Sequence, residues 1–245
     1  MKAQNFLCLY IIIIFVNYSS QRYLSLTTHQ SNRFSSKNGA QDLIGKKVEC
    51  PNGGVLKNFV LLKERGQYYY RFQCYSSNSG KLDEGEPILK GSTLHYTQHN
   101  SRSLSKSLET LDGVKYYCWV DYGLNSFEIV KDNGNKIKTT GYCKGIKTKS
   151  KKLNINTKQI KGTYDSLDNL VGIIVGPTNA ENDADIAYVL REVKYKVSSS
   201  FFHLFTKKVT ISYYYSYSIV KNLRTITNNY KSSFARLRNG NNQKI

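Results

Sequence analysis

Long apolar stretches are rare in this sequence. The longest uninterrupted one, residues 6–16, has eleven residues, whereas a helix needs about 20 to cross a bilayer, so a permanent membrane anchor is not expected. Lys2 precedes this run and small polar residues follow it, and that order is typical of a secretory signal peptide. We therefore expect residues 1–20 to be a cleaved signal peptide rather than a short buried element, and the mature chain to be secreted.

Cysteine is also scarce, with five in the chain. Removal of residues 1–20 would take Cys8 and leave four, namely Cys50, Cys74, Cys118 and Cys143. Structural zinc sites usually draw ligands from closely spaced pairs, but the nearest two of these cysteines are 24 residues apart. Because the secretory compartment is oxidising, an even count in an exported chain indicates two disulfides instead.

Motifs that carry catalytic chemistry are missing. The sequence has no G-x-S-x-G elbow and no P-loop, and no cysteine would stay free as a nucleophile once both disulfides form. Zinc-finger, helix-turn-helix and aromatic RNA-binding signatures are absent as well. The spacing of acidic residues does not exclude a glycosidase site, because its two catalytic carboxylates need to be close only in space and not in sequence. The sequence favours a protein that is not an enzyme and that needs no cofactor.

Proline and tryptophan are few, whereas tyrosine is abundant. Three prolines and one tryptophan stand against twenty tyrosines. Tyrosine packs its ring and keeps its hydroxyl near water, which suits sheets with one partly wet face. The composition therefore predicts an all-β protein.

The segment bounded by cysteines at residues 50–74 occurs a second time at residues 118–143. A shift of 68 positions places Cys50 on Cys118 and aligns further residues of several chemical types. These pairs are Leu56 and Leu124, Phe59 and Phe127, Leu61 and Ile129, Lys63 and Lys131, and Gly66 and Gly134. One extra residue after the second glycine brings Cys74 onto Cys143. Matches at so many positions indicate a duplicated unit.

Each copy is predicted to form a β-hairpin. Residues 59–63 and 127–131 would be the outgoing strands, and ERG and DNG supply residues that tolerate a tight turn. The return strand of the first copy alternates between two faces and places its cysteine on the buried one. Four cysteines allow three pairings; the repeat favours Cys50 with Cys74 and Cys118 with Cys143, each closing one hairpin.

A third copy without cysteines is predicted next. Leu170 follows Tyr164 by six residues, as Leu56 follows Cys50, and Ile173 then takes the place of Phe59. The alternating residues 187–197 would be its return strand, and residues 209–219 would form a closing strand of the core.

Three related hairpins predict a pseudo-threefold β-prism, with a two-sheet β-sandwich as the alternative. The expected organisation is a signal peptide at 1–20, a polar linker at 21–44, two disulfide-bounded β repeats at 45–143, a lysine-rich connector at 144–161, a third β unit with the closing strand at 162–220, and a flexible basic tail at 221–245.

The opening CPNGGVL and the closing YYYRFQC of the first copy resemble the cysteine-bounded repeats of dermatopontin-like secreted proteins. The resemblance covers mainly residues 48–75 and 116–144, and the second copy lacks the proline. It implies an extracellular protein that associates with matrix or binds carbohydrate. The repeats are also similar to β-prism repeats appended to some secreted perforins, but the sequence shows no pore-forming region.

Positive charge dominates, with a formal net charge of +19. Residues 144–161 hold seven lysines and residues 194–245 hold ten basic residues, in both cases without an acid. For an exported chain, this field favours an anionic polysaccharide or glycan, an acidic membrane surface or an acidic matrix protein as partner, and nucleic acid is a less expected one. A solvated connector and a solvated tail explain the same charges without a ligand.

Candidate ligand-binding residues are aromatic and basic side chains of the repeats and the connector. Four aromatic rings are candidates to stack on sugars, and structural packing is the competing interpretation: Tyr69, Tyr75, Trp119 and Tyr122. Four cations are candidates to meet sulfate or carboxylate groups: Arg71, Lys147, Lys151 and Lys152. His95 and His99 would share a face but have no third ligand, so no metal site is expected.

The sequence thus predicts a secreted, lectin-like or matrix-associated protein that binds extracellular carbohydrate or an anionic polymer. The alternative is a structural matrix or coat protein that acts through protein–protein contacts.

Overall fold

The computed structural model describes residues 23–77, 89–146, 153–162, 165–178, 186–202, 206–221 and 224–227. These residues form strands and short 3-10 helices, with no α-helix among them. The all-β prediction is confirmed. The predicted signal peptide and residues 228–245 lie outside the described residues.

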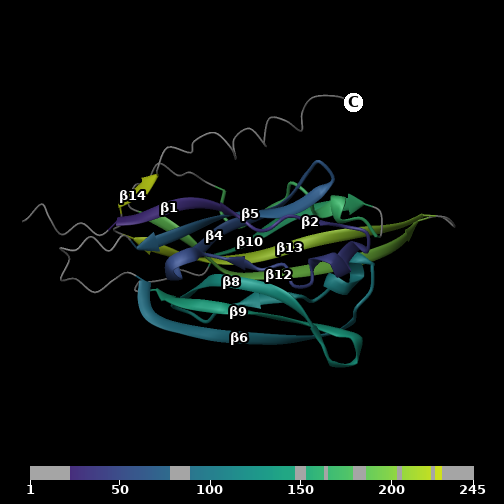
Figure 1. Cartoon of the computed structure of the whole chain (residues 1–245), viewed down its shortest axis with the longest axis horizontal. Helices are drawn as coiled ribbons and strands as arrows, with labels where there is room; N and C mark the ends of the chain where they lie inside the picture. Colours follow the sequence, from purple (N-terminus) through teal and green to yellow (C-terminus); the bar gives the residue numbers. More distant parts are fainter. Residues whose placement is uncertain are drawn as a thin grey trace, which may run out of the picture.

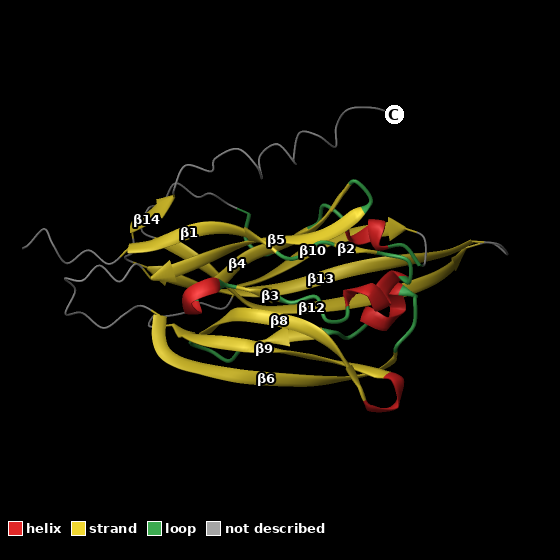
Figure 2. Ribbon diagram, viewed as in Figure 1, coloured by secondary structure: helices red, strands yellow, loops and turns green. Residues whose placement is uncertain are grey.

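The strands form three sheets that surround one core (Figures 1 and 2). The first sheet has the order β11 (Ile174–Val175), β4 (Val55–Glu64), β5 (Gln67–Ser77), β1 (Tyr23–Gln30) and β14 (Arg224–Thr227), with β2 (Phe34–Ser35) beside β5. The second has the order β3 (Val48–Glu49), β8 (Tyr122–Asp132), β9 (Lys136–Ile146) and β6 (Leu89–Ser103). The third has the order β7 (Lys115–Tyr117), β12 (Ile186–Phe202), β13 (Thr206–Lys221) and β10 (Leu153–Gly162).

Each sheet follows the same plan of one short strand, the two strands of a hairpin and one longer strand. The short strand always comes from another unit of the chain: β3 pairs with β8, β7 with β12, and β11 with β4. The three units therefore interlock in a closed cycle. This arrangement is the predicted pseudo-threefold one, with three sheets rather than the two of a sandwich.

The same short motif leads into each short strand. A 3-10 helix ends in a leucine that stands two residues before a glycine with positive φ, in η1 (Gly39–Leu43), η3 (Leu108–Leu111) and η5 (Leu167–Leu170). The glycine N–H then donates to a carbonyl of a neighbouring hairpin: Gly45 to Ile129 at 2.8 Å, Gly113 to Tyr195 at 3.0 Å and Gly172 to Leu61 at 2.9 Å. Positive φ is the reason these positions are glycine.

The two predicted hairpin turns are confirmed. Arg65 and Gly66 join β4 to β5 with φ of 50° and 78°. In the second copy, η4 (Asn133–Asn135) joins β8 to β9, and Gly134 and Asn135 have φ of 64° and 59°. Glycine and asparagine are the residues that adopt this backbone conformation most readily, so the extra residue of the second copy is accommodated in its turn.

The core lies where the inner faces of the three sheets meet. Leu56, Leu124 and Leu190 take equivalent positions in β4, β8 and β12, and all three are fully buried. Around them the ring of Phe127 lies 4.2 Å from Tyr116 and 4.7 Å from Phe59, measured between centroids. Burying side chains from all three units in one cluster is what holds the sheets together.

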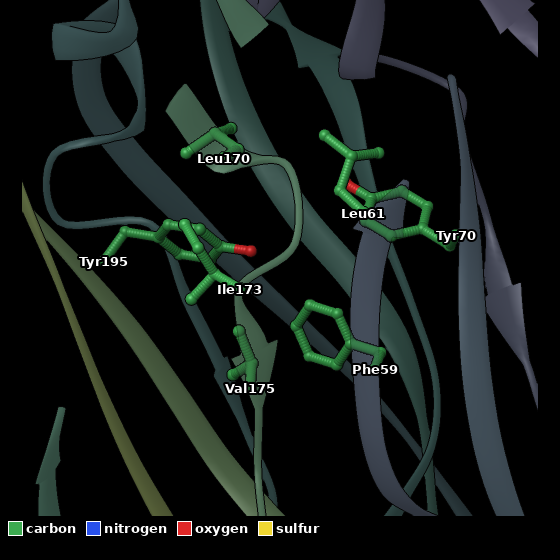
Figure 3. Close-up of a pocket in the computed structure, with 7 residues that line it drawn as sticks. All are labelled: Phe59, Leu61, Tyr70, Leu170, Ile173, Val175 and Tyr195. Atoms are coloured by element: carbon green, nitrogen blue, oxygen red, sulfur yellow. The ribbon is translucent and has the colours of Figure 1, made fainter. Parts of the chain in front are cut away.

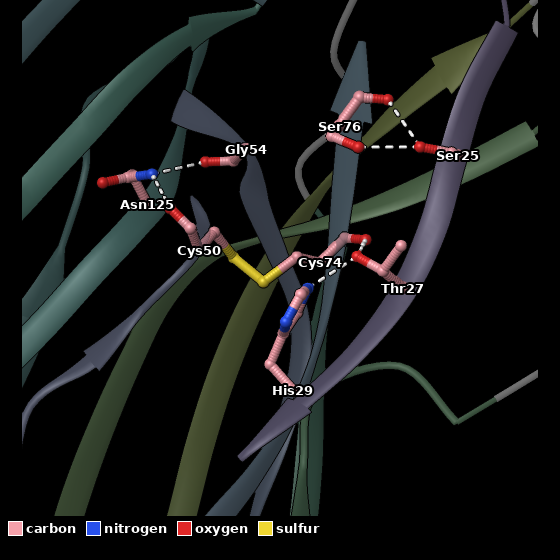
Figure 4. Close-up of a disulfide and its surroundings, with 8 residues drawn as sticks. All are labelled: Ser25, Thr27, His29, Cys50, Gly54, Cys74, Ser76 and Asn125. Carbon is pink, nitrogen blue, oxygen red and sulfur yellow. Dashed lines mark hydrogen bonds between the residues drawn. A yellow bond between two sulfur atoms is a disulfide. The ribbon is translucent and has the colours of Figure 1, made fainter. Parts of the chain in front are cut away.

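A register shift follows each of these leucines. The extra residues are Lys57, Asn125 and Arg191, and all three are buried. The Nδ2 group of Asn125 donates to the carbonyls of Cys50, at 3.1 Å, and Gly54, at 2.7 Å (Figure 4). The bulge in the second unit thus fixes the loop that follows β3 of the first.

Both disulfides pair as predicted. Cys50 is bonded to Cys74, and Cys118 to Cys143, with a Cα–Cα distance of 5.7 Å in each. Figure 4 shows the first bond beside β1. All four cysteines are buried, so each bridge ties the entry of a hairpin to its return strand inside the core.

The third unit exists, but its predicted alignment was wrong. The structural equivalent of Leu56 and Leu124 is Leu190, because the same register shift follows all three. Leu170 instead ends η5 and corresponds to the leucines that end η1 and η3. The L-x-G motif, present as LIG, LDG and LVG, is the sequence signal that would have given this alignment.

Two strand roles also differ from the prediction. Residues 187–197 belong to the outgoing strand β12 and not to a return strand, because they pair with β7 on one side and β13 on the other. Residues 209–219 lie in β13, which is a central strand of the third sheet rather than a closing one. The hairpin of the third unit is formed by β12 and β13. The repeat pattern did not show it, because β12 does not follow β11 as closely along the chain as β4 follows β3 and β8 follows β7.

Residues 21–44 are not simply a linker. Residues 23–30 form β1, which pairs with β5 along seven positions from Leu24 to Gln30, and Ala40 and Leu43 are buried. The lysine-rich connector is also shorter than predicted, because β9 continues to Ile146 and residues 153–162 form β10.

Candidate functional site

The single tryptophan of the chain lies on an exposed loop. Residues 118–121, here called the Trp119 loop, connect β7 of the third sheet to β8 of the second. Trp119 is 50% exposed and the adjacent Val120 is 58% exposed. Large apolar side chains this open are unusual in the described surface, where Leu94 and Tyr142 are the others. An exposed apolar pair indicates a contact surface.

The loop is anchored at both ends. Cys118 at its start is disulfide-bonded to Cys143, and its N–H donates to the carbonyl of Arg191 at 3.0 Å. At its end, the N–H of Tyr122 donates to the carbonyl of Trp119 at 3.1 Å, and the N–H of Ile146 donates to the carbonyl of Asp121 at 2.7 Å. An anchored loop loses little conformational entropy on binding, which favours affinity.

Asp121 occupies an uncommon backbone conformation in this loop. Its φ is 68°, in the left-handed region that non-glycine residues seldom adopt and that aspartate tolerates better than most. The equivalent loop of the first unit, η2 (Pro51–Gly53), has positive φ at Asn52 and Gly53. The tight turn therefore belongs to the repeat, while the exposed tryptophan is particular to the second unit.

Two further side chains extend this surface along β7. The rings of Tyr117 and Trp119 lie 6.0 Å apart at 63°. The Nζ of Lys115 lies 4.3 Å from the centroid of Tyr117 and 2.9 Å from Oε1 of Glu192. Sequence reasoning missed Lys115 and Tyr117, although residues 115, 117 and 119 follow the two-residue period that puts strand residues on one face.

Tyr122 is the second predicted residue at this site. It is half-buried and packs against the main core, so it supports the loop more than it faces solvent. The structure thus places Tyr122, the first residue of β8, directly after the loop that carries Trp119. It adds a partly exposed aromatic ring, Tyr117, and a cation, Lys115, to this surface.

Tyr75 is not available to a ligand. It is 2% exposed and packs in a small cluster with residues that include Val55, Ile146 and Val189. Burial raises the pKa of its hydroxyl. The prediction that this ring stacks on a sugar was wrong, because both faces of the first sheet are covered at this position.

Tyr69 is buried too, at 4% exposure, against Val60 and Leu62 on the outer face of the first sheet. The guanidinium of Arg33 lies 5.0 Å from its ring centroid, which leaves no open aromatic face there. Arg71 is half-buried and its Nη2 lies 3.4 Å from the Tyr69 hydroxyl. Tyr69 and Arg71 both lie on β5 and are far from the Trp119 loop in the sequence. The other three predicted cations, Lys147, Lys151 and Lys152, lie outside the described residues.

His95 and His99 are exposed on β6 but contact different groups. The Nε2 of His95 lies 2.7 Å from Oγ1 of Thr140, and the Nδ1 of His99 lies 2.6 Å from Oδ2 of Asp132. This contact lowers the pKa of the Asp132 carboxyl. Within the described ranges, no three potential metal ligands lie close together.

One pocket opens between β4, β5, η5 and β12 (Figure 3). Its lining is apolar except for two hydroxyls, those of Tyr70 and Tyr195, which point toward its centre in Figure 3. The cavity volume is about 10 Å³, close to the lower limit for one water molecule. It is a packing gap in the core and offers no space for an organic ligand.

Comparison with protein-family models, curated proteins and solved structures gave no match for this chain. The resemblance to dermatopontin-like proteins therefore stays a prediction. In the part of the chain that is described, no helix has the length and hydrophobicity to span a bilayer.

Proposed function

We propose that this protein is secreted and acts without catalysis, binding extracellular carbohydrate or an anionic polymer through the Trp119 loop. The observation that carries the proposal is a half-exposed tryptophan held on a disulfide-anchored loop beside a second aromatic ring. Such rings bind the apolar faces of sugars while losing little side-chain entropy. The apolar run at residues 6–16 and the two disulfides support export.

Charge supports an anionic ligand. The chain as a whole carries a formal charge of +19. Lys115 lies beside Tyr117 at the edge of the aromatic surface, where it is paired with Glu192. A sulfated or carboxylated polysaccharide offers both sugar rings for stacking and charges that this field attracts. Affinity for such a polymer falls as salt rises, because exposed charges are screened.

The first experiment screens the mature protein on an array of neutral glycans and polyanions and measures the affinity of the best ligand by calorimetry. Trp119→Ala is expected to weaken binding roughly tenfold, about 1.4 kcal/mol, whereas Val120→Ser, at the neighbouring exposed position, leaves it nearly unchanged. Equal affinity of the Trp119→Ala variant and the unmodified protein would show that the ligand does not use this loop.

The alternative function is a structural matrix or coat role through protein–protein contacts. The adjacent exposed side chains of Trp119 and Val120 suit an apolar protein partner as well. The two functions predict different effects of salt and of the Val120→Ser variant on the affinity for the partner. A protein partner would bind in high salt and would lose affinity with Val120→Ser, whereas the polysaccharide complex would dissociate in high salt and tolerate that change.

Export is tested separately. Expression of the full chain in a secretory host is expected to release a product whose N-terminus lies near residue 20 and whose four remaining cysteines are all oxidised. Intracellular retention of a chain that keeps residues 1–20 would refute the secretion part of the proposal.

A further inference from the structure

The long edge strand of the second sheet has one side without a partner strand. β6 ends the order β3-β8-β9-β6, and no other strand of the described ranges pairs with it. Residues 93–99 pair regularly with β9 between two register shifts, and six of these seven residues, all except Tyr96, are exposed. A regular edge strand presents a row of backbone N–H and C=O groups that can accept another strand.

The pseudo-threefold arrangement shows that this position can take a further strand. β1, β6 and β10 are equivalent, because each flanks the return strand of a hairpin. β1 carries β14 on its outer side, in parallel pairing from Tyr23 with Arg224 to Leu26 with Thr227. β10 is interrupted by a register shift between Asn156 and Gln159. β6 therefore combines a regular segment with an edge that the described residues leave open.

We propose that β6 pairs antiparallel with β6 of a second copy of this chain, around a twofold axis at Tyr96. The two second sheets then join into one continuous sheet across a closed, isologous interface. In this register Leu94 lies opposite Gln98 of the second copy, and His95 lies opposite Thr97. Leu94, one of the few large apolar side chains at the surface with 37% exposure, gains a neighbour.

The sequence of the segment suits a second copy. Edge strands avoid one another through lysine, proline or inward-pointing charges, yet residues 93–99 read TLHYTQH, with no proline, lysine, arginine, aspartate or glutamate. Within residues 93–99, self-pairing around Tyr96 opposes no two groups that are always charged. The first such residues beyond the segment are Lys90 and Arg102, which would face each other only if the pairing extended past the register shifts that bound the segment. Arg102 is paired with Asp112 at 2.7 Å. A segment of seven residues pairs over about 23 Å.

The dependence on salt concentration distinguishes this dimerisation from the binding of a polyanion under the proposed function. Each copy carries a formal charge of +19, so the two copies repel each other and screening favours the dimer. Polyanion binding has the opposite dependence. The inference stands on β6 alone and does not depend on the Trp119 loop.

The experiment measures the mass of the mature protein by sedimentation over a range of concentrations and salt. The unmodified chain is expected to dimerise. Leu94→Lys with Gln98→Lys places lysine opposite lysine twice, because each changed position faces the other across the axis, and like charges opposite each other destabilise strand pairing. The dimer dissociation constant is expected to rise at least tenfold, and Leu94→Glu with Gln98→Glu has the same effect.

Mixing the two charged variants provides the rescue. The lysine chain and the glutamate chain are expected to form a one-to-one heterodimer, because opposite charges now face each other. Gln67→Lys is the matched control: it is also a change from glutamine to lysine at an exposed strand position, but it lies on β5 of the first sheet, so its dimer persists. Circular dichroism confirms that each variant is folded.

Three results of the mass measurements would overturn the inference. They are a chain that stays monomeric at every concentration and salt, a lysine variant that dimerises like the unmodified chain, and a mixture of charged variants that stays monomeric. Binding of an unrelated extended peptide by a monomeric chain would assign the edge to another partner and also overturn it.

Discussion

Single residues on the inner faces have little freedom to change. Gly141 lies opposite Tyr96 in the pairing of β9 with β6. A Cβ atom there would lie 2.1 Å from the carbonyl oxygen of Ser126 and 2.9 Å from Cε1 of Tyr96. The first of these is a backbone atom of the neighbouring strand, which cannot move aside without breaking the sheet. Glycine is required here by space and not by φ.

Gly141→Ala is therefore expected to destabilise the protein by about 2–4 kcal/mol through overpacking. The measurement is urea unfolding followed by circular dichroism. Gly66→Asn is the control, because no atom lies within 4 Å of the corresponding Cβ and asparagine tolerates the positive φ. A loss for Gly141→Ala no larger than that for the control would show that the strands relax around the added methyl group.

Asn125 is the second residue whose chemistry is fixed by its surroundings. It is buried, and its amide group supplies the donor for two carbonyls, those of Cys50 and Gly54. Asn125→Leu keeps a similar volume but leaves both carbonyls without that donor, so the expected loss is about 2 kcal/mol. Thermal or urea unfolding measures it against Asn32→Leu, the same change at an exposed position. Equal stability of the two variants would mean that water replaces the amide.

At the scale of elements, the hairpins of the first two units are each closed by a disulfide that lies next to a β-bulge. The disulfide joins the residue after the short strand to the return strand. The bulge next to it fixes the loop of the neighbouring unit, as Asn125 does for residues 50–54. The third unit has no disulfide in this place. Pro177 takes the position of Cys50 and Cys118 there, since it follows Val175 by two residues as they follow Val48 and Tyr116.

Removal of the Cys118–Cys143 bridge by a double change to alanine is expected to cost about 3 kcal/mol, the value of the chain-entropy model for a loop of this length. Urea unfolding of the oxidised variant measures the loss. The variant is also expected to keep the Trp119 loop in place less firmly, so its affinity for the ligand of the unmodified protein falls. Unchanged stability would show that the hairpin is already ordered in the unfolded chain.

Across the whole molecule, tyrosine rings fill many positions in the core that aliphatic side chains occupy in other proteins. Seven of the described tyrosines are buried. In four of them, burial raises the pKa of the hydroxyl far above its usual value: Tyr70, Tyr75, Tyr96 and Tyr116. Each hydroxyl must stay protonated in the folded state. Among the described residues, the hydroxyl of Tyr96 has no hydrogen-bond partner, so its ionisation would leave an uncompensated buried charge. At Tyr116 the neighbouring Tyr195 adds to the effect of burial in raising the pKa.

This predicts alkaline unfolding. Because the folded-state pKa values lie above those of the unfolded chain, stability is fully present below about pH 10, the unfolded value, and falls as pH rises beyond it. Absorbance of ionised tyrosine and circular dichroism are followed together during alkaline titration. The buried group is expected to ionise in one step that coincides with loss of structure. Gradual ionisation of all tyrosines in a chain that stays folded would contradict the assigned burial.

The sequence by itself determined the β class, the two disulfides and two of the three hairpins. Those features depend on neighbours in the chain: a two-residue alternation, a turn with glycine, and cysteines repeated at one spacing. The sequence named Trp119 only as one of four candidate rings, with structural packing as the competing interpretation, and the structure shows it exposed. Tyr69 and Tyr75 show the limit of alternation, since a sheet that is covered on both faces buries both sets of side chains.

Only the tertiary structure decided how the units interlock. Each short strand pairs with a hairpin of another unit, and contacts between residues far apart in the chain leave no periodic pattern in either segment. The same long-range packing determined that Leu190 and not Leu170 is the third core leucine, that residues 23–30 join a sheet, and that β6 ends one. Whether a side chain is buried depends on which other element packs against that face of its strand, and the residue pattern of the strand itself does not specify that element.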